Sequence, residues 1–197
     1  MIKIGLLSDT HGFLPERVFE LFKDVDEIWH AGDIGNLEVT DRLKAFKPLR
    51  AVYGNIDDQL IRSEFPEYLN FKVEGLSVSM THIAGRPGKY SRNAVDFIRE
   101  TKPDIFVCGH SHVLLVQQDK SKNLLWLNPG ACGNKGFHSI QTALRFQVNG
   151  TKIEQTDSIK KTLVKILHEA YRLNPNFIDT SEGYKIITEL SFPKFWG

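Results

Sequence analysis

The feature of this sequence that most constrains its fold is a series of short apolar segments, each bounded by Gly, Asn or Asp. Runs of this length and composition predict buried β-strands. A chain of 197 residues is long enough to bury them in one hydrophobic core without the help of disulfide bonds. We expect strands at Ile2–Ser8, Glu27–His30, Arg50–Tyr53, Ser77–His82, Asp104–Cys108, Val113–Gln117, Leu124–Leu127 and Ala143–Val148.

Segments with helical periodicity lie between the early strands and predict helices at Pro15–Lys23, Leu37–Phe46 and Tyr90–Thr101. Alternation of strand and helix favours parallel pairing of the strands in this half of the chain. Beyond Asp104 the predicted strands are joined by short turns, as in antiparallel hairpins. Two such strand systems in one domain predict an α/β fold, with two stacked mixed β-sheets flanked by helices in an α/β/β/α sandwich.

The end of the chain has a less regular pattern. A hairpin signal at Asn149-Gly150 precedes a predicted helix near Ile159–Leu173 and a predicted strand at Tyr184–Leu190. We therefore expect a core over residues 1–157, with residues 158–197 as a C-terminal helix and aromatic tail of the same domain. The aromatic residues from Phe192 to Trp196 imply packing against this chain or against a second copy, so a homo-oligomer stays open.

Composition and charge exclude several classes of protein. With 25 Lys and Arg against 24 Asp and Glu, the net charge of +1 provides no excess of basic residues for non-specific binding of nucleic acid. A nucleic acid partner is therefore not favoured, although a local basic patch is compatible with the sequence. No apolar run reaches the length that spans a membrane, and the N-terminal residues lack the pattern of a signal peptide. We therefore expect a cytoplasmic protein without a membrane partner.

Side chains that bind metal ions follow five of the predicted strands. In open α/β sheets, ligand sites form beyond the carboxyl ends of the strands, so these five loops are expected to converge on one point. Their oxygen and nitrogen donors suit two divalent transition ions, with Mn, Fe, Zn, Ni and Co as candidates. No cysteine belongs to the set, which argues against a structural zinc site. The candidate ligands are Asp9, His11, Asp33, Asn55, His82, His110 and His112.

The order and spacing of these residues resemble the motif series of the calcineurin-like metallophosphoesterase superfamily. The matching motifs are Asp9-x-His11, Gly32-Asp33, Gly54-Asn55, His82 and Gly109-His110-x-His112, and Asn128-Pro129-Gly130 also matches its small YfcE-like phosphodiesterase branch. The resemblance spans roughly residues 1–150 and implies a β-sandwich with a dinuclear metal site. It implies that Asp9, His11 and His112 hold one ion, that Asn55, His82 and His110 hold the other, and that Asp33 bridges the two.

The resemblance also implies a reaction, in which a metal-bridging hydroxide attacks the phosphorus of a phosphate ester in line with the leaving oxygen. Asp33, Asn55 and His82 are then the catalytic residues. In the related phosphoprotein phosphatases, the residue after the Asn ligand is a His that is thought to act as an acid, whereas this chain has Ile56 there. Because Ile56 cannot donate a proton, we expect small phosphodiesters, and esters with acidic leaving groups, to be better substrates than alkyl phosphomonoesters.

Four further residues have candidate supporting roles. Asp57 and His30 lie near ligands along the chain and are candidates to orient them through hydrogen bonds. For His30, a structural role at the end of its strand explains the residue equally well. Lys135 and His138 follow the Asn-Pro-Gly motif, where they either bind a substrate phosphate or are ordinary solvated loop residues.

The chain departs from the family pattern after His82, and its fold is compatible with a second function. Ile83 follows His82 where the family usually has Gly, so the local turn is expected to differ. A retromer subunit of the same fold is a protein-binding scaffold with an impaired metal site, and this chain is compatible with that role. The complete set of candidate ligands favours an enzyme over the scaffold.

Overall fold

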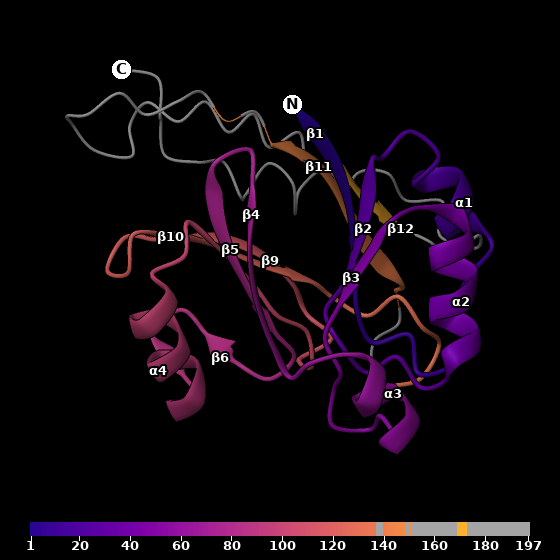
Figure 1. Ribbon diagram of the computed structural model, residues 1–197, viewed down its shortest axis with the longest axis horizontal. Helices are drawn as coiled ribbons and strands as arrows, with labels where there is room; N and C mark the ends of the chain where they lie inside the picture. Colours follow the sequence, from indigo (N-terminus) through magenta and orange to yellow (C-terminus); the bar gives the residue numbers. More distant parts are fainter. Residues whose placement is uncertain (137–139, 149, 151–168, 173–197) are drawn as a thin grey trace.

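The computed structural model describes residues 1–136, 140–148, 150 and 169–172, and its main feature is a pair of five-stranded sheets (Figure 1). The first sheet has the strand order β12 (Glu169–Arg172), β11 (Thr142–Val148), β1 (Ile2–Leu7), β2 (Glu27–His30), β3 (Leu49–Ala51). The second has the order β4 (Tyr68–Val73), β5 (Leu76–Thr81), β8 (Ile105–Val107), β10 (Leu124–Pro129), β9 (Leu114–Asp119).

Each sheet combines parallel and antiparallel pairs, as predicted. In the first sheet β1, β2 and β3 are parallel neighbours, and β11 is antiparallel to β1. In the second sheet β5, β8 and β10 are parallel neighbours, with β4 and β9 antiparallel at the edges. Backbone hydrogen bonds join the loops that follow these parallel strands, for example from Asp9 N–H to Gly32 O at 2.9 Å. The parallel core of each sheet therefore delivers its loops to neighbouring positions.

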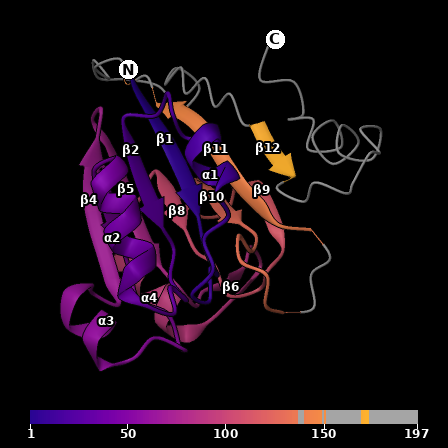
Figure 2. The same ribbon diagram turned by 90° about the vertical axis from the view of Figure 1, so that its right-hand side faces the viewer.

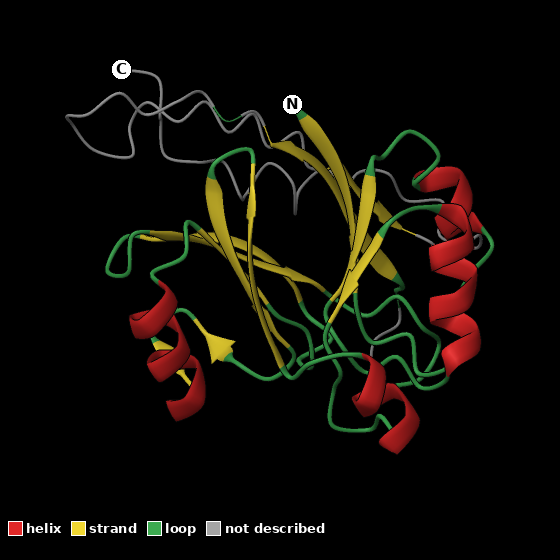
Figure 3. Cartoon of the chain, viewed as in Figure 1, coloured by secondary structure: helices red, strands yellow, loops and turns green. Residues whose placement is uncertain are grey.

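Helices cover the outer faces of the two sheets (Figure 3). The helices α1 (Arg17–Leu21), α2 (Leu37–Phe46) and α3 (Gln59–Glu64) contribute apolar side chains to a cluster outside the first sheet. Figure 2 shows α1 and α2 lying over the strands of this sheet. On the other side, Ala94 and Ile98 of α4 (Arg92–Thr101) pack with Phe106 and Trp126 of the second sheet. The predicted α/β/β/α sandwich is confirmed.

The main core lies between the two sheets and is centred on aromatic side chains. The ring of Trp29 on β2 lies 5.1 Å from the ring of Phe71 on β4 and 5.5 Å from that of Phe146 on β11, measured between centroids. Its neighbour Ile28 belongs to the cluster under the helices, because successive side chains of a strand point to opposite faces. Burial on both faces explains why central strands such as β8 and β10 are nearly continuous apolar runs.

The boundaries of several elements differ from the predictions. Helix α1 is shorter than the predicted Pro15–Lys23, and Tyr90 belongs to a short hairpin of β6 (Gly85–Arg86) and β7 (Lys89–Tyr90). Helix α4 begins after Ser91, whose side chain accepts a hydrogen bond from Ala94 N–H at 3.3 Å. This N-cap satisfies a backbone donor that would otherwise be free, and it fixes the start of the helix.

The prediction of a helix near Ile159–Leu173 is wrong for residues 169–172, which form β12. This strand pairs antiparallel with β11, so it covers an edge whose backbone groups would otherwise be unpaired. The rest of that segment, the predicted strand at Tyr184–Leu190 and the aromatic tail lie outside the described residues. The division of the chain at residue 157 therefore stays a prediction. No helix in the described part of the chain is long and apolar enough to cross a membrane.

Candidate metal centre

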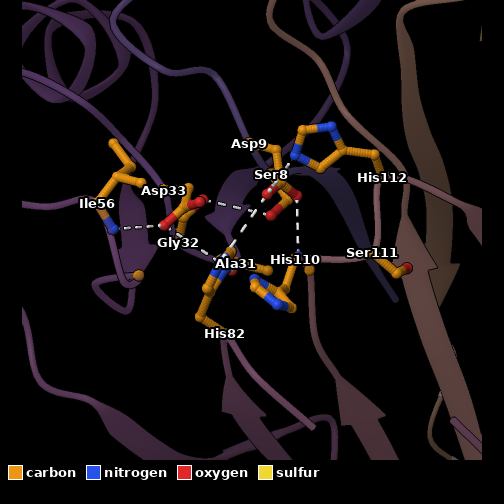
Figure 4. Close-up of polar contacts among 12 residues, drawn as sticks. Ser8, Asp9, Ala31, Gly32, Asp33, Ile56, His82, His110, Ser111 and His112 are labelled. Atoms are coloured by element: carbon orange, nitrogen blue, oxygen red, sulfur yellow. Dashed lines mark hydrogen bonds and ion pairs between the residues drawn. The ribbon is translucent and has the colours of Figure 1, made fainter. Parts of the chain in front are cut away.

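The structure gathers six of the predicted ligands into two adjoining groups. Figure 4 shows Asp9, Asp33, His82, His110 and His112 close together. Asp9, His11 and His112 each offer a donor atom within 4.8 Å of the others. Asp33, His82 and His110 do the same in the second group. This is the grouping that the family resemblance implies for these six residues, and their assignment to metal ions remains a prediction.

The two groups are close enough to form one site. His11 Nε2 lies 3.7 Å from Asp33 Oδ2, and His82 Nε2 lies 3.9 Å from Asp9 Oδ1, so each carboxylate faces a histidine of the other group. Within the first group, His112 Nε2 lies 3.3 Å from Asp9 Oδ1. The position of Asp33 between the groups is compatible with a bridging ligand.

The surroundings of His82 favour a bound cation. Its Nδ1 lies 2.7 Å from the carbonyl oxygen of Ala31, so Nδ1 donates to it and the lone pair is on Nε2. This Nε2 is buried without a hydrogen-bond partner among the described residues, and so is Asp9 Oδ1. His82 Nε2 also lies 3.2 Å from Asp33 Oδ1. Buried acceptors that face one another repel unless a proton or a cation lies between them.

The pKa values of this pair follow from the same arrangement. Burial lowers the pKa of His82, but the adjacent carboxylates of Asp33 and Asp9 outweigh burial and raise this pKa above its ordinary value. Burial raises the pKa of Asp33, but His82 and the Ile56 N–H group, 3.1 Å from Oδ1, lower it by more. The pair therefore holds a negative carboxylate beside a position that attracts positive charge.

The loops that carry the ligands have unusual backbone conformations. A residue other than Gly costs on the order of 1 kcal/mol in the left-handed region, and such residues persist where packing and hydrogen bonds hold them. The structure describes eight residues other than Gly in this region, and five of them are candidate ligands. The φ angles are 55° at Asp9, 50° at His11, 54° at Asp33, 69° at His110 and 56° at His112. Strain of this kind collects at functional sites, which supports a role for these loops beyond folding.

Two glycines allow the loops to approach one another. A Cβ atom on Gly54 would overlap the carboxylate of Asp33, and a Cβ atom on Gly109 would overlap the hydroxyl of Ser8 and lie 2.9 Å from Asp9 Oδ2. The seventh predicted ligand, Asn55, follows Gly54 and is exposed. Its loop therefore lies against Asp33, which places Asn55 beside the second group.

Asp57 joins two of the ligand loops through the backbone. Its carboxylate accepts hydrogen bonds from the N–H groups of Ile34 at 3.1 Å, Gly35 at 2.7 Å and Gly54 at 2.7 Å. The supporting role predicted for Asp57 thus takes a definite form, since it holds the loop of Asp33 against the loop of Asn55. None of these bonds goes to a ligand side chain.

His30 also supports the loops rather than a ligand side chain. Its Nδ1 accepts a hydrogen bond from Gly32 N–H at 3.2 Å, so its Nε2 carries the hydrogen and donates to Thr10 Oγ at 2.9 Å. Thr10, which lies between two ligands, donates in turn to Ile34 O at 2.9 Å. Burial lowers the pKa of His30 to about 3, so the ring is neutral at physiological pH.

Asn128 has a supporting role that was not predicted from the sequence. This buried side chain donates to Gly109 O at 2.8 Å and to Ser111 Oγ at 3.1 Å, and it accepts from Gly130 N–H at 2.9 Å. It therefore holds the loop of His110 and His112. The signal was present, because Asn128 directly follows the predicted apolar strand Leu124–Leu127, as the candidate ligands follow their predicted strands.

The two predicted substrate-binding residues have different outcomes. Lys135 is exposed on a loop that packs against the first ligand loop, where Gly133 N–H donates to Asp9 O at 3.0 Å. Its position near the site is compatible with a role in binding substrate. His138 lies outside the described residues, so its role stays a prediction.

Comparison with known protein families gives a match over most of the chain. The model of the calcineurin-like phosphoesterase superfamily domain matches residues 2–151. The chain belongs to this superfamily. The matched segment contains every candidate ligand, so the resemblance seen in the motifs is confirmed.

Two relatives of this calcineurin-like phosphoesterase have names that indicate phosphoester hydrolysis. A probable metallophosphoesterase of Methanothermobacter thermautotrophicus is 30% identical over 133 residues, which cover 65% of this chain and 76% of that protein. A phosphodiesterase of Methanocaldococcus jannaschii is 27% identical over 150 residues, which cover 66% of this chain and 84% of that protein. These relatives support the assignment of this chain as a phosphoesterase hydrolase.

Solved structures of low sequence identity confirm the fold. An archaeal phosphodiesterase superposes with a TM-score of 0.64 at 21% identity, over 87% of this chain and 99% of that one. Vps29 of Entamoeba histolytica, in complex with zinc, has a TM-score of 0.62 at 15% identity, over 88% of this chain and 100% of that one. The fold is thus shared by proteins with different names, and the site itself must decide between their functions.

Proposed function

We propose that this calcineurin-like phosphoesterase is a phosphodiesterase that acts on small substrates with two divalent metal ions bound by the candidate ligands. The observation that carries the proposal is the pair of adjoining ligand groups, with buried donor atoms of Asp9 and His82 that have no hydrogen-bond partner among the described residues. Nitrogen and oxygen donors without thiolates fit Mn, Fe, Zn, Ni or Co. We assign Asp9, His11 and His112 to one ion, and Asn55, His82 and His110 to the other, with Asp33 shared.

The residues around the site have separate tasks in this proposal. When bound, two divalent ions bind the phosphate oxygens and lower the pKa of the attacking water. The hydrogen bond from His82 Nδ1 to Ala31 O keeps the lone pair of Nε2 directed into the site. The Ile56 N–H group holds one oxygen of Asp33 and so fixes the orientation of that carboxylate. Prior positioning of this kind is the main source of rate in phosphoryl transfer.

Preference for diesters follows from the side chain of Ile56. This residue is next to Asn55, lies beside Asp33 in Figure 4 and cannot protonate a leaving oxygen. The leaving group of a substrate must therefore depart as a stable anion or obtain its proton from solvent. A diester carries one negative charge less than a doubly ionised monoester, so it makes a smaller demand on the cations of the site. We propose Lys135 as a further contact for the phosphate.

The test compares bis-p-nitrophenyl phosphate with p-nitrophenyl phosphate. Each ester is measured with Mn²⁺, with Ni²⁺ and after chelation, in the wild-type protein and in Asp33→Ala. The variant Asp41→Ala is a matched control, because it removes an exposed carboxylate of α2 outside the site. We expect metal-dependent cleavage of the diester that is lost in Asp33→Ala and kept in Asp41→Ala. Bound metal without turnover of either ester would instead favour a protein-binding scaffold.

A further inference from the structure

Large apolar side chains are exposed beside the candidate ligands. The structure describes six exposed large apolar residues, and four of them lie within two positions of a ligand in the sequence. We call these four the apolar rim. Its members are Phe13, Ile56, Ile83 and Val113, with exposed fractions of 42%, 45%, 43% and 61%.

Chain connectivity places each residue of the apolar rim close to a candidate ligand. Consecutive Cα atoms are 3.8 Å apart, so a residue one or two positions from a ligand lies within about 8 Å of that ligand's Cα. The four residues come from the loops after β1, β3, β5 and β8, which are the loops that converge on the site. Figure 4 shows Ile56 next to Asp33, to which its backbone N–H donates.

The exposure of these side chains has no structural reason within the described chain. Burial of a large apolar side chain is favourable, and the other strands and helices of this protein direct such side chains into three clusters. Exposed apolar residues that are scattered singly need no explanation, whereas a group of them around a site marks a surface for binding.

The same loops carry little positive charge. A surface that binds a polyanion such as nucleic acid gathers several Lys and Arg residues along the path of the backbone. The loop residues 8–14, 31–36, 54–58, 82–86 and 109–113 contain a single one, Arg86. The small number of positive side chains in these loops therefore suits a substrate with one phosphate group rather than a polyanion.

We propose that the apolar rim binds an apolar substituent of the substrate, so that the preferred substrates are phosphodiesters with an alkyl or aryl group next to the scissile phosphate. This inference rests on the proposed phosphodiesterase function and adds a substrate class to it. The site binds the phosphate, and the rim covers the apolar group and removes it from water. In hydrolysis, water adds to phosphorus and the leaving alkoxide or phenoxide departs, so no further reactant is needed.

The kinetic test uses two diesters with the same leaving group, p-nitrophenyl hexyl phosphate and p-nitrophenyl methyl phosphate. Five added methylene groups in partial contact with the rim should raise kcat/KM by about tenfold in the Mn²⁺-loaded wild-type protein. We expect Val113→Ser and Ile83→Ser each to reduce this hexyl-to-methyl ratio about threefold. Leu60→Ser is the matched control, because Leu60 is exposed on α3 with no candidate ligand within four positions. Its ratio should equal that of the wild type.

A binding measurement separates the rim from turnover. Calorimetric titration with hexyl methylphosphonate and methyl methylphosphonate should show the same preference for the hexyl compound, and the same loss in Val113→Ser. Turnover of both diesters with a hexyl-to-methyl ratio near one would overturn the role of the rim while leaving the phosphodiesterase intact. Absence of turnover in any diester, with metal bound, would count against the phosphodiesterase itself. A dimer that dissociates in Val113→Ser would identify the rim as a contact between copies and would also overturn the proposal.

Discussion

Removal of the Asp57 carboxylate should destabilise the fold far more than removal of its neighbour. Asp57 is buried and accepts three hydrogen bonds from the backbone N–H groups of Ile34, Gly35 and Gly54. A hydrogen bond to a charged group contributes about 1.5–3 kcal/mol, and Asp57→Ala leaves three donors without a partner. Allowing for water that enters the space, we expect a loss of about 4 kcal/mol in the free energy of unfolding.

Asp58 provides the control for this prediction. It is the N-cap of α3, exposed, and accepts one hydrogen bond, from Ile61 N–H at 3.1 Å. Replacement of such a cap by Ala costs about 1 kcal/mol. Asp57→Asn keeps one acceptor oxygen, so the free energy of unfolding that it loses should lie between the losses of the two Ala variants.

Urea unfolding of the metal-free protein measures these losses. The midpoint should shift while the slope stays constant, because the surface exposed on unfolding is the same. Titration with Mn²⁺ should then show weaker binding in Asp57→Ala than in Asp58→Ala, since only Asp57 holds two ligand loops together. Equal losses of stability in the two Ala variants would refute the argument that Asp57 joins these loops.

Four further predictions test other parts of the structure. Burial holds the pKa of His30 at about 3 in the folded protein, against 6.5 for an ordinary His. At a pH between these two values, the His30 ring therefore binds a proton in the unfolded chain but not in the folded one. Stability should therefore fall as the pH falls below 6.5, with His30 contributing about 2 kcal/mol of the loss at pH 5, and thermal melting of His30→Gln should show a flatter pH profile. Gly54→Ala should weaken Mn²⁺ binding at least tenfold in calorimetry, since the added Cβ overlaps Asp33, whereas Gly88→Ala, which meets no atom within 4 Å, should bind Mn²⁺ as the wild type does. Ile56→His should raise the ratio of monoesterase to diesterase activity with p-nitrophenyl esters, and an unchanged ratio with metal still bound would contradict the role assigned to this position. Mn²⁺ at 100 times its Kd should stabilise the wild-type protein by about 3 kcal/mol, and differential scanning calorimetry should show no such shift in Asp9→Ala.

The sequence was sufficient to predict the central strands because they are buried on both faces. Leu124–Leu127 is apolar throughout and Glu27–His30 has an apolar centre at Ile28 and Trp29, and the structure places buried strands at both. Strand β4 escaped prediction because it lies at a sheet edge and alternates exposed polar residues with half-buried ones. Helix α3 has six residues and buries only Ile61, so its apolar pattern is too short to detect.

The candidate ligands could also be identified from the sequence, for a topological reason. Parallel strands of a sheet end at the same side, so residues such as Asp9 and Asp33, which follow the neighbouring strands β1 and β2, approach one another. The sequence therefore determined the class of fold, the set of candidate ligands and the family. Their supports could not be identified in the same way, since the partners of Asp57 and Asn128 lie on loops that are distant in the sequence.

Only the tertiary structure decided which atoms face one another. The direction of the His82 lone pair depends on Ala31, and the left-handed backbone at Asp9 and Asp33 depends on hydrogen bonds between loops. Whether an apolar residue such as Val113 is buried or exposed depends equally on what packs over it. Patterns along a chain report local geometry and average burial, whereas a tautomer, a close approach or an exposed rim arises from contacts between segments that the sequence keeps apart.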